Sequence, residues 1–178
     1  MIDGDPDDLR SHIRDVPDFP QPGVLFRDIT PLLADAAALR RAITGLADAL
    51  RASGGPPDRV AGIEARGFVV AAPLALELGV GFVPVRKPGK LPAETVREDY
   101  DLEYGTDALE VHADACAPGE RILVVDDVLA TGGTAAAATR LLRGVGAEVT
   151  GLGVLIELTA LGGRSTVGDL PVTALLSY

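Results

Sequence analysis

The sequence predicts an α/β fold in which a mainly parallel, twisted sheet is flanked by helices. Short apolar segments alternate along the chain with longer segments whose apolar residues recur at helical spacing. Such alternation implies right-handed crossover connections and a sheet that is covered on both faces. At 178 residues and 47% hydrophobic composition, the chain is expected to form one domain with a substantial core.

In the first half of the chain, the elements follow from their local patterns. Between residues 36 and 53, apolar residues fall on one helical face, and two glycines then end the helix. RVAGI (59–63) is a short apolar strand, and EARG forms a turn after it. A helix of small residues is expected over 68–78 and a second strand over 81–86.

In the second half, strands are expected over 108–114, 122–127, 148–157 and 171–177, with a helix over 134–144. The chain stops at LLSY, which leaves the pairing of the last strand open. From residue 87 to about 104, KPGKLPAETVREDYDLEY has neither period, so we expect an irregular, mobile lid there.

The charge and the cysteine content exclude several classes of protein. A net charge of −10 argues against nucleic acid as a partner, because Lys and Arg supply most of that affinity. The acidic start MIDGDPDD does not resemble a secretory signal, and Pro73 and Glu77 interrupt the longest apolar region, so we expect no membrane association. A single cysteine, Cys116, fits a reducing compartment, and a cytoplasmic location is expected.

The cations of the chain are unevenly distributed. Of sixteen Lys and Arg residues only two are lysines, Lys87 and Lys90, and both lie in VRKPGKLP. Either this is chance in an arginine-favouring sequence, or the predicted lid needs flexible point charges rather than planar guanidinium groups.

VVDDVLATGGT (124–134) is the segment that points most directly to chemistry. Between a buried strand and a helix, ATGGT can wrap backbone N–H groups around a phosphate, with Thr131 and Thr134 adding hydroxyls. The alternative is a plain turn capped by Thr134. A Walker A loop is excluded because no lysine precedes the final threonine.

Two carboxylates, Asp126 and Asp127, directly precede this turn. They would repel a phosphate, so their partners should be sugar hydroxyls or Mg²⁺ carried by a polyphosphate. A phosphorylated ribose satisfies both halves of the segment, whereas the alternative is two solvated carboxylates at a strand end. EARG, RKPGK and DDVLATGGT each follow a predicted strand, and ligands bind beyond the carboxyl ends of parallel strands.

VVDDVLATGGT resembles the phosphoribosyl diphosphate signature of the type I phosphoribosyltransferases. FPQPGVLFRDITPLL, EARGF, VPVRKPGKLP and YDLEYGTDALEVH together resemble the adenine-specific members of that family, over about residues 18–159. The resemblance implies the type I phosphoribosyltransferase fold with a small N-terminal hood (about 1–34) over the base site, and a core (about 35–178) with a lid near 87–104. It implies purine salvage, with transfer of the 5-phosphoribosyl group from 5-phospho-α-D-ribose 1-diphosphate to adenine, giving AMP and diphosphate.

The resemblance also implies a role for each matching residue of the sugar and diphosphate sites. The 5′-phosphate would be held by Ala130, Thr131, Gly132, Gly133 and Thr134. Asp126 and Asp127 would bind the ribose hydroxyls. The diphosphate would be met by Arg66, Arg86, Lys87 and Lys90, with a strained or cis peptide between Glu64 and Ala65. Mg²⁺ would arrive on the diphosphate, with no direct protein ligand.

At the base, the resemblance implies that Phe26 stacks on adenine and that main-chain groups of Leu25 and Arg27 read its edge. Leu129 would lie on the opposite face of the base. Glu103 would accept the proton that adenine loses, and Tyr104 would help to close the lid. From the residues alone, Phe26 could equally be a core aromatic, and Glu103 could be one of several exposed carboxylates.

Two rival readings stay open from the sequence. A regulator that keeps the phosphate signature without catalysis is one, although this acidic chain has no basic DNA-binding extension. Another purine or pyrimidine phosphoribosyltransferase is the second. The expected homodimer rests on the resemblance.

Overall fold

The structure is a computed structural model that describes residues 9–102 and 105–178. The chain divides into two compact units, Met1–Gly45 and Leu46–Tyr178. Within the described residues, no helix is both long and apolar enough to cross a membrane.

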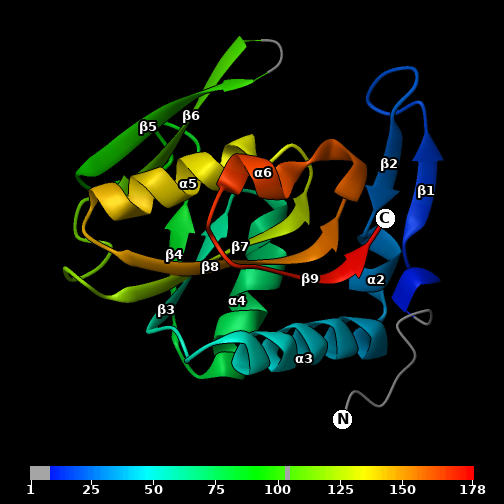
Figure 1. The fold of residues 1–178 in the computed structure, drawn as a ribbon, viewed down its shortest axis with the longest axis horizontal. Coiled ribbons are helices and arrows are strands. Elements are labelled where there is room, and N and C mark those ends of the chain that lie inside the picture. The colour runs from blue at the N-terminus through cyan, green and yellow to red at the C-terminus, as the bar shows by residue number, and fades with distance from the viewer. Residues whose placement is uncertain (1–8, 103–104) are drawn as a thin grey trace. The chain divides into compact units, whose positions relative to one another are not determined.

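The larger unit is built on a five-stranded sheet in the order β4-β3-β7-β8-β9 (Figure 1). Its strands are β3 (Arg59–Ile63), β4 (Gly81–Val85), β7 (Arg121–Leu129), β8 (Glu148–Glu157) and β9 (Val172–Ser177). All neighbouring pairs are parallel, as predicted. From β3 the chain moves outward to β4 on one side and returns to β7 on the other, so the topological switch point lies between β3 and β7.

Two helices cover opposite faces of this sheet (Figure 1). Helix α4 (Arg66–Leu78) packs against β3 and β7, and α5 (Gly133–Gly144) packs against β7 and β8. Opposite faces follow from right-handed crossovers that run in opposite directions along the sheet. Between the layers lie fully buried aliphatic side chains such as Leu74, Val124 and Leu152.

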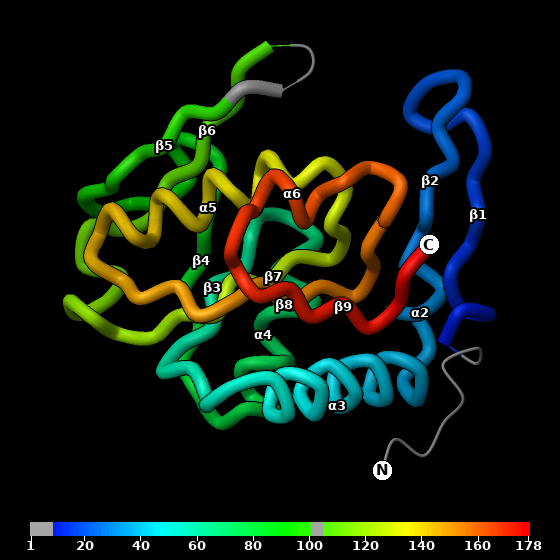
Figure 2. Tube along the Cα trace, viewed as in Figure 1, coloured from blue at the N-terminus to red at the C-terminus, as the bar shows by residue number. Residues whose placement is uncertain are grey.

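The segment predicted to be irregular, 87–104, contains a strand, so that prediction is wrong over Thr95–Leu102. β5 (Thr95–Leu102) pairs antiparallel with β6 (Gly105–His112) in a hairpin separate from the main sheet, which Figure 2 shows projecting at one end. Val96 and Tyr100 supply the apolar side of β5, and the strand packs against α5. Charged residues between these two positions mask the strand pattern.

Several shorter features were also not predicted. η1 (Thr159–Leu161) and α6 (Gly163–Val167) lie between β8 and β9. β7 continues two residues beyond the predicted end, and α4 begins two residues before the predicted start. The last strand pairs with β8 as far as Ser177, so the short tail does not disrupt the edge of the sheet.

The smaller unit begins with a hairpin of β1 (Arg14–Pro17) and β2 (Leu25–Asp28), followed by α2 (Thr30–Ala34). An ion pair joins Arg14 to Asp28 at 3.1 Å, across the first pair of the ladder. The helix predicted over 36–53 is α3 (Ala36–Ser53), which begins in this unit and ends in the larger one.

Candidate active site

Three polar segments meet at the carboxyl edge of the sheet because they follow adjacent strands. EARG follows β3, RKPGK follows β4 and DDVLATGGT ends β7, and these strands are neighbours in the order β4-β3-β7. The predicted convergence of these segments at one edge therefore agrees with the topology. The switch point between β3 and β7 is where a ligand is expected in a sheet of this kind.

Arg66 and Asp127 face each other across the switch point. Arg66 begins α4, and its Nε lies 2.8 Å from Oδ2 of Asp127, in a contact without hydrogen-bond geometry. The Arg66 side chain is half exposed, whereas that of Asp127 is 5% exposed. The peptide between Glu64 and Ala65 just before Arg66 is cis, in agreement with the sequence prediction. The Arg66–Asp127 ion pair therefore places a half-exposed cation beside a buried carboxylate at the carboxyl edge of the sheet.

The two carboxylates of β7 lie in different surroundings from ordinary surface aspartates. Burial, together with the charge of Asp127, raises the pKa of Asp126 well above its usual value. Burial also raises the pKa of Asp127, and the nearby Arg66 partly offsets that effect. Asp126 Oδ1 accepts a hydrogen bond of 2.9 Å from the Asp127 N–H, and Gly67 packs against the same oxygen. Hydroxyl donors from a sugar would compensate carboxylates held in this way.

The predicted phosphate loop lies between β7 and α5, as its spacing indicates. Gly132 has φ of +86°, a left-handed conformation that glycine adopts without strain, and the twelve-residue α5 begins at Gly133. Thr131 is exposed, and Thr134 lies in the first turn of the helix. Backbone N–H groups at a helix N-terminus, with two hydroxyls beside them, form a suitable cradle for a phosphate.

Helix α6 packs closely against this loop. A Cβ on Gly132 would lie 2.6 Å from the Gly163 carbonyl oxygen, and a Cβ on Gly163 would lie 2.4 Å from the Ala130 carbonyl oxygen. Leu129 is 2% exposed and packs against Gly163 as part of the core. Arg164 anchors α6 to β8 through a bidentate pair with Glu157, with both N–O distances at 2.7 Å.

Glu64 connects the EARG turn to the RKPGK segment. Its Oε2 accepts a hydrogen bond of 2.8 Å from the Lys87 N–H and one of 3.2 Å from Arg86 Nε. The backbone hydrogen bond from Lys87, followed by the contribution of Arg86, lowers the pKa of Glu64. Arg86 also donates to the Lys90 carbonyl oxygen at 3.1 Å, while Lys90 itself is exposed. Glu64 therefore places the predicted diphosphate cations beside Arg66.

Replacing Glu64 by glutamine is expected to lower Tm at neutral pH by about 2–4 °C, the shift for a typical hydrogen bond lost from a chain of this size. Because the folded-state pKa is depressed, the carboxylate stabilises the fold above its ordinary value of 4.5 and loses this effect as the pH falls through the folded pKa. In thermal melts taken from pH 8 into acid, the Tm difference between wild type and variant should therefore stay constant above pH 4.5 and shrink progressively below it. A Tm difference that stays constant with pH would contradict this role of Glu64. So would a difference equal to the one caused by Glu94→Gln in the same segment.

The residues predicted to bind the base lie in several parts of the chain. In the smaller unit, Phe26 is half-buried and its ring meets Phe19 edge-to-face at 5.1 Å, so it is not a fully buried core aromatic. Arg27 forms an ion pair with Asp15, and Leu25 is exposed. Glu103 and Tyr104 lie outside the described residues.

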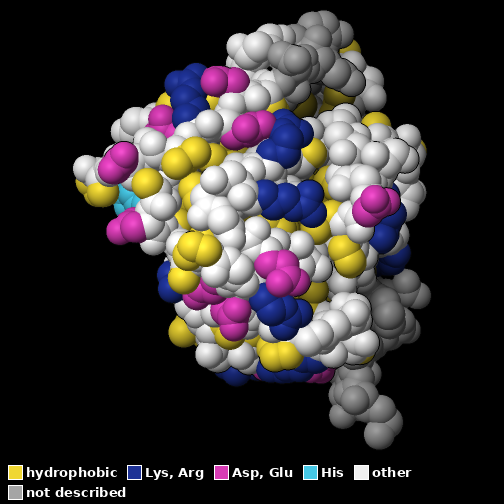
Figure 3. All heavy atoms as spheres, turned by 60° about the vertical axis from the view of Figure 1, so that its left-hand side comes forward, with side chains coloured by type: hydrophobic (Ala, Val, Ile, Leu, Met, Phe, Trp, Pro, Cys, Tyr) yellow, Lys and Arg dark blue, Asp and Glu magenta, His cyan; other side chains and the backbone are white. Residues whose placement is uncertain are grey.

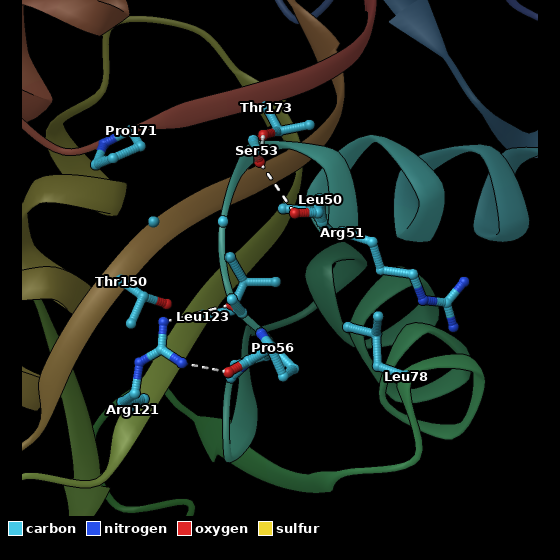
Figure 4. Close-up of a pocket in the computed structure, with 14 residues that line it drawn as sticks. Leu50, Arg51, Ser53, Pro56, Leu78, Arg121, Leu123, Thr150, Pro171 and Thr173 are labelled. Atoms are coloured by element: carbon cyan, nitrogen blue, oxygen red, sulfur yellow. Dashed lines mark hydrogen bonds between the residues drawn. The ribbon is translucent and has the colours of Figure 1, made fainter.

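A separate pocket lies at the opposite, amino edge of the sheet (Figure 4). Arg121 lines this pocket and donates hydrogen bonds to the Pro56 carbonyl oxygen at 2.6 Å and to the Gly55 carbonyl oxygen at 3.4 Å. These bonds tie β7 to the segment before β3. These hydrogen bonds give Arg121 a structural role. We therefore expect the catalytic residues at the carboxyl edge of the sheet rather than in this pocket.

Chemically, the carboxyl edge offers a candidate anion cradle, one buried and one half-buried carboxylate, and cations on the segments that follow β3 and β4. Such a set fits a phosphorylated sugar with a second anionic group. On the molecular face in Figure 3, basic side chains lie beside acidic ones rather than in one broad patch. A ligand anion at this edge is therefore met by local cations, despite the net charge of −10.

Several contributors to this edge were missed by reasoning from sequence. Gly163 and Arg164 were not singled out because their effect arises from packing behind the loop, although the pair of glycines after β8 is a signal of close approach. The sequence indicates Glu64 only as the residue before the predicted strained or cis peptide. Its hydrogen bonds with Arg86 and Lys87 depend on the pairing of β3 with β4.

Comparison with known proteins gives a consistent result. Residues 32–167 match the family model described as the phosphoribosyl transferase domain. Adenine phosphoribosyltransferase from Thermobifida fusca is 60% identical over 164 residues, which cover 92% of each chain. The enzyme of that name from Rhodospirillum centenum is 57% identical, covering 96% of this chain and 98% of its own length.

Solved structures agree with these relatives. Adenine phosphoribosyltransferase from Thermoanaerobacter pseudethanolicus superposes with a TM-score of 0.94 at 49% identity, over 98% of this chain and all of the other. The Saccharomyces cerevisiae enzyme, solved with an imino-altritol bisphosphate and adenine, gives a TM-score of 0.92 at 38% identity, over 96% of this chain and 98% of its own.

Proposed function

This chain belongs to the adenine phosphoribosyltransferases of the phosphoribosyl transferase domain family, and we propose that the carboxyl edge of its sheet is the active site. The enzyme acts in purine salvage and transfers the 5-phosphoribosyl group from 5-phospho-α-D-ribose 1-diphosphate to adenine, releasing AMP and diphosphate. The observation that carries the site assignment is the adjacency of the candidate phosphate loop to the half-buried Asp126 and the buried Asp127.

We assign the ribose 5-phosphate to the segment from Asp126 to Thr134. Residues 130–134 would hold the 5′-phosphate through backbone N–H groups and the hydroxyls of Thr131 and Thr134. The two carboxylates would accept hydrogen bonds from the ribose 2′- and 3′-hydroxyls. Their raised pKa values support this assignment, because buried carboxylates gain most from donors that a ligand supplies.

The diphosphate is assigned to Arg66, Arg86, Lys87 and Lys90. As the bond between ribose C1 and diphosphate breaks, negative charge builds on the leaving group. Cations already held near that position stabilise the transition state without further reorganisation. Glu64 supports this role by fixing the main chain of Lys87 and the side chain of Arg86.

Mg²⁺ is proposed to enter with the diphosphate. No group of three or more His, Cys, Asp or Glu side chains in the described part of the chain is arranged to hold a metal ion. An ion carried by the diphosphate would keep substrate oxygens and water as its ligands and would need no side-chain ligand from the protein. When bound, Mg²⁺ would neutralise part of the diphosphate charge.

At the base, Phe26 is proposed to stack on adenine, with main-chain groups of Leu25 and Arg27 reading the polar edge. Leu129, which the resemblance placed on the opposite face of the base, is 2% exposed and belongs to the core of the larger unit instead. Glu103 would accept the proton that adenine loses as its ring nitrogen bonds to C1. Tyr104 and the rest of residues 87–104 would close over the site and exclude water, which is a competing nucleophile.

The specificity for adenine is tested by comparing initial rates on four bases with phosphoribosyl diphosphate held constant. We expect rapid AMP formation from adenine, with hypoxanthine, guanine and xanthine at least about a hundredfold slower, since a polar edge that mismatches the site leaves donors and acceptors unpaired. Comparable rates with hypoxanthine would contradict the base-site assignment.

A homodimer is proposed from an apolar surface on the larger unit. Val69, Leu76 and Phe82 are 43%, 83% and 37% exposed, and they lie on α4 and on β4, the strand at one edge of the sheet. Val69 and Leu76 are seven residues apart and share a helix face. A second copy of the chain would cover such a surface.

Leu76→Asp is expected to convert the dimer into a monomer, because a dimer would bury the new charge in its apolar contact. Sedimentation equilibrium on the whole protein measures this change. Leu161→Asp, a matched change at a side chain that is 50% exposed away from α4 and β4, should leave the dimer intact. A wild-type monomer, or a Leu76→Asp dimer, would exclude this surface as the dimer interface.

A cytoplasmic location is proposed from the single free cysteine, Cys116.

A further inference from the structure

Lys87 does not point freely into solvent; its side chain is held by the β5–β6 hairpin. Its ammonium forms an ion pair with Asp107 on β6 and lies 3.2 Å from the hydroxyl of Tyr100 on β5. The Tyr100 hydroxyl lies 3.2 Å from Asp107 Oδ2 and 3.4 Å from Thr134 Oγ1, in the first turn of α5. Four elements of the chain therefore meet at one cluster, Lys87–Tyr100–Asp107–Thr134.

The hydrogen bonds of this cluster use the full capacity of the Tyr100 hydroxyl. Its single proton is donated to Asp107, and its oxygen accepts from both Lys87 and Thr134. Tyr100 is 6% exposed, so water does not readily replace these bonds.

The charges of the cluster compensate each other. Burial alone would lower the pKa of Lys87, but its hydrogen bonds with Asp107 and Tyr100 outweigh burial and raise it. The hydrogen bond from Lys87 lowers the pKa of Asp107. Both groups are therefore ionised at neutral pH, and each is the other's counter-ion.

The main chain of Lys87 is fixed separately from its side chain. The Lys87 N–H donates to Glu64 at 2.8 Å, so the backbone stays at the carboxyl edge whatever the ammonium does. A change of partner at the ammonium therefore requires only rotation about side-chain bonds. This arrangement suits a cation that alternates between two carboxylate or phosphate partners.

Given the proposed assignment of Lys87 to the diphosphate, we propose that Asp107 is a positioning residue that holds Lys87 until the diphosphate displaces it. Asp107 and the diphosphate compete for the same ammonium, so part of the binding free energy of the diphosphate is used to break the Lys87–Asp107 pair. Leaving diphosphate lets the pair re-form, which favours product release.

The cluster also touches the phosphate loop. The Thr134 hydroxyl has one proton, which it donates to Tyr100 in this structure. A 5′-phosphate in the loop would accept that proton instead. Binding of the sugar phosphate thus removes one bond from Tyr100, which is itself a partner of Lys87.

The test is titration of inorganic diphosphate into the ligand-free, full-length enzyme by calorimetry. Asp107→Asn, which keeps the shape of the side chain, should lower the Kd about three- to fivefold, the upper range for loss of a partly exposed ion pair. Asp99→Asn removes the same charge from the same hairpin, where Asp99 forms an ion pair with Arg97, and controls for long-range electrostatics. A merely structural role of Asp107 would weaken binding rather than tighten it.

The dependence on Lys87 is tested in the same titration. Lys87→Met should raise the Kd, and adding Asp107→Asn to it should change the Kd no more than Asp99→Asn does. If Lys87→Met leaves the Kd unchanged, the diphosphate role in the proposed function is wrong. If Lys87→Met weakens binding while Asp107→Asn matches Asp99→Asn or weakens it too, the role of Asp107 is wrong and the proposed function stands.

Discussion

An enzyme carrying Arg66→Ala together with Asp127→Asn is expected to lose AMP formation by at least about a thousandfold in kcat/KM while keeping its fold. Removing one preorganised charge-stabilising group typically lowers kcat by about a hundred- to a thousandfold, and this variant removes two groups of different function. Arg66 is assigned to the diphosphate and Asp127 to a ribose hydroxyl. The two side chains lie 2.8 Å apart.

The double change is preferred because Arg66→Ala alone would leave a buried carboxylate without its counter-ion. Burial raises the folded-state pKa of Asp127 above its ordinary value, so the ionised form destabilises the fold at neutral pH. Asparagine removes that destabilisation, and Tm should stay close to the wild-type value. Steady-state rates and thermal melts measure both effects.

Arg51→Ala with Asp48→Asn is the matched control, because it removes an exposed ion pair on α3, outside the residues assigned to the site and its lid. This control should keep kcat/KM within about threefold of the wild type, as expected for surface changes. Activity in the Arg66–Asp127 variant near the level of the control would exclude both residues from the reaction.

Gly163→Ala should raise KM for phosphoribosyl diphosphate by about a hundredfold or more, although Gly163 is not expected to touch the substrate. Its new Cβ would lie 2.4 Å from the Ala130 carbonyl oxygen and 2.8 Å from Leu129 Cδ1. The phosphate loop or α6 must therefore move, and a misplacement of about 1 Å in a positioned group can reduce rates by that factor.

Gly144→Ala provides the comparison for this loop variant. Gly144 ends α5, where an added Cβ meets nothing within 4 Å and φ is not positive. The KM of the Gly144→Ala enzyme for phosphoribosyl diphosphate should match that of the wild type. The Tm of this variant should be equal or higher, because alanine favours the helix. Gly163→Ala with unchanged KM would show that α6 does not set the position of the loop.

The fold was largely predictable because its strands are short apolar runs separated by helices with clear periodicity. β3, β8 and α3 have the predicted bounds. A strand was predicted where β6 lies, but β5 was missed because half of the residues in TVREDYDL are charged, and its strand character depends on pairing with β6 and packing on α5. A local pattern does not contain those partners.

In the candidate site, too, local sequence motifs were predictable, whereas contacts between residues far apart in the sequence were not. The candidate phosphate loop and the adjacent aspartates were identified from VVDDVLATGGT, since all their residues lie within eleven consecutive letters of the sequence. The pairing of Lys87 with Asp107 joins residues twenty positions apart, and the contact of Gly163 with the loop depends on the connection between β8 and β9. Such partners become visible only once the strands are placed.

A crystal structure of the enzyme with AMP would test the ribose 5-phosphate assignment most directly. The 5′-phosphate should lie within hydrogen-bond distance of backbone N–H groups of residues 130–134 and of the Thr134 hydroxyl. The ribose hydroxyls should donate to Asp126 and Asp127. A nucleotide bound with its phosphate away from this loop, or with its ribose away from both carboxylates, would contradict the assignment.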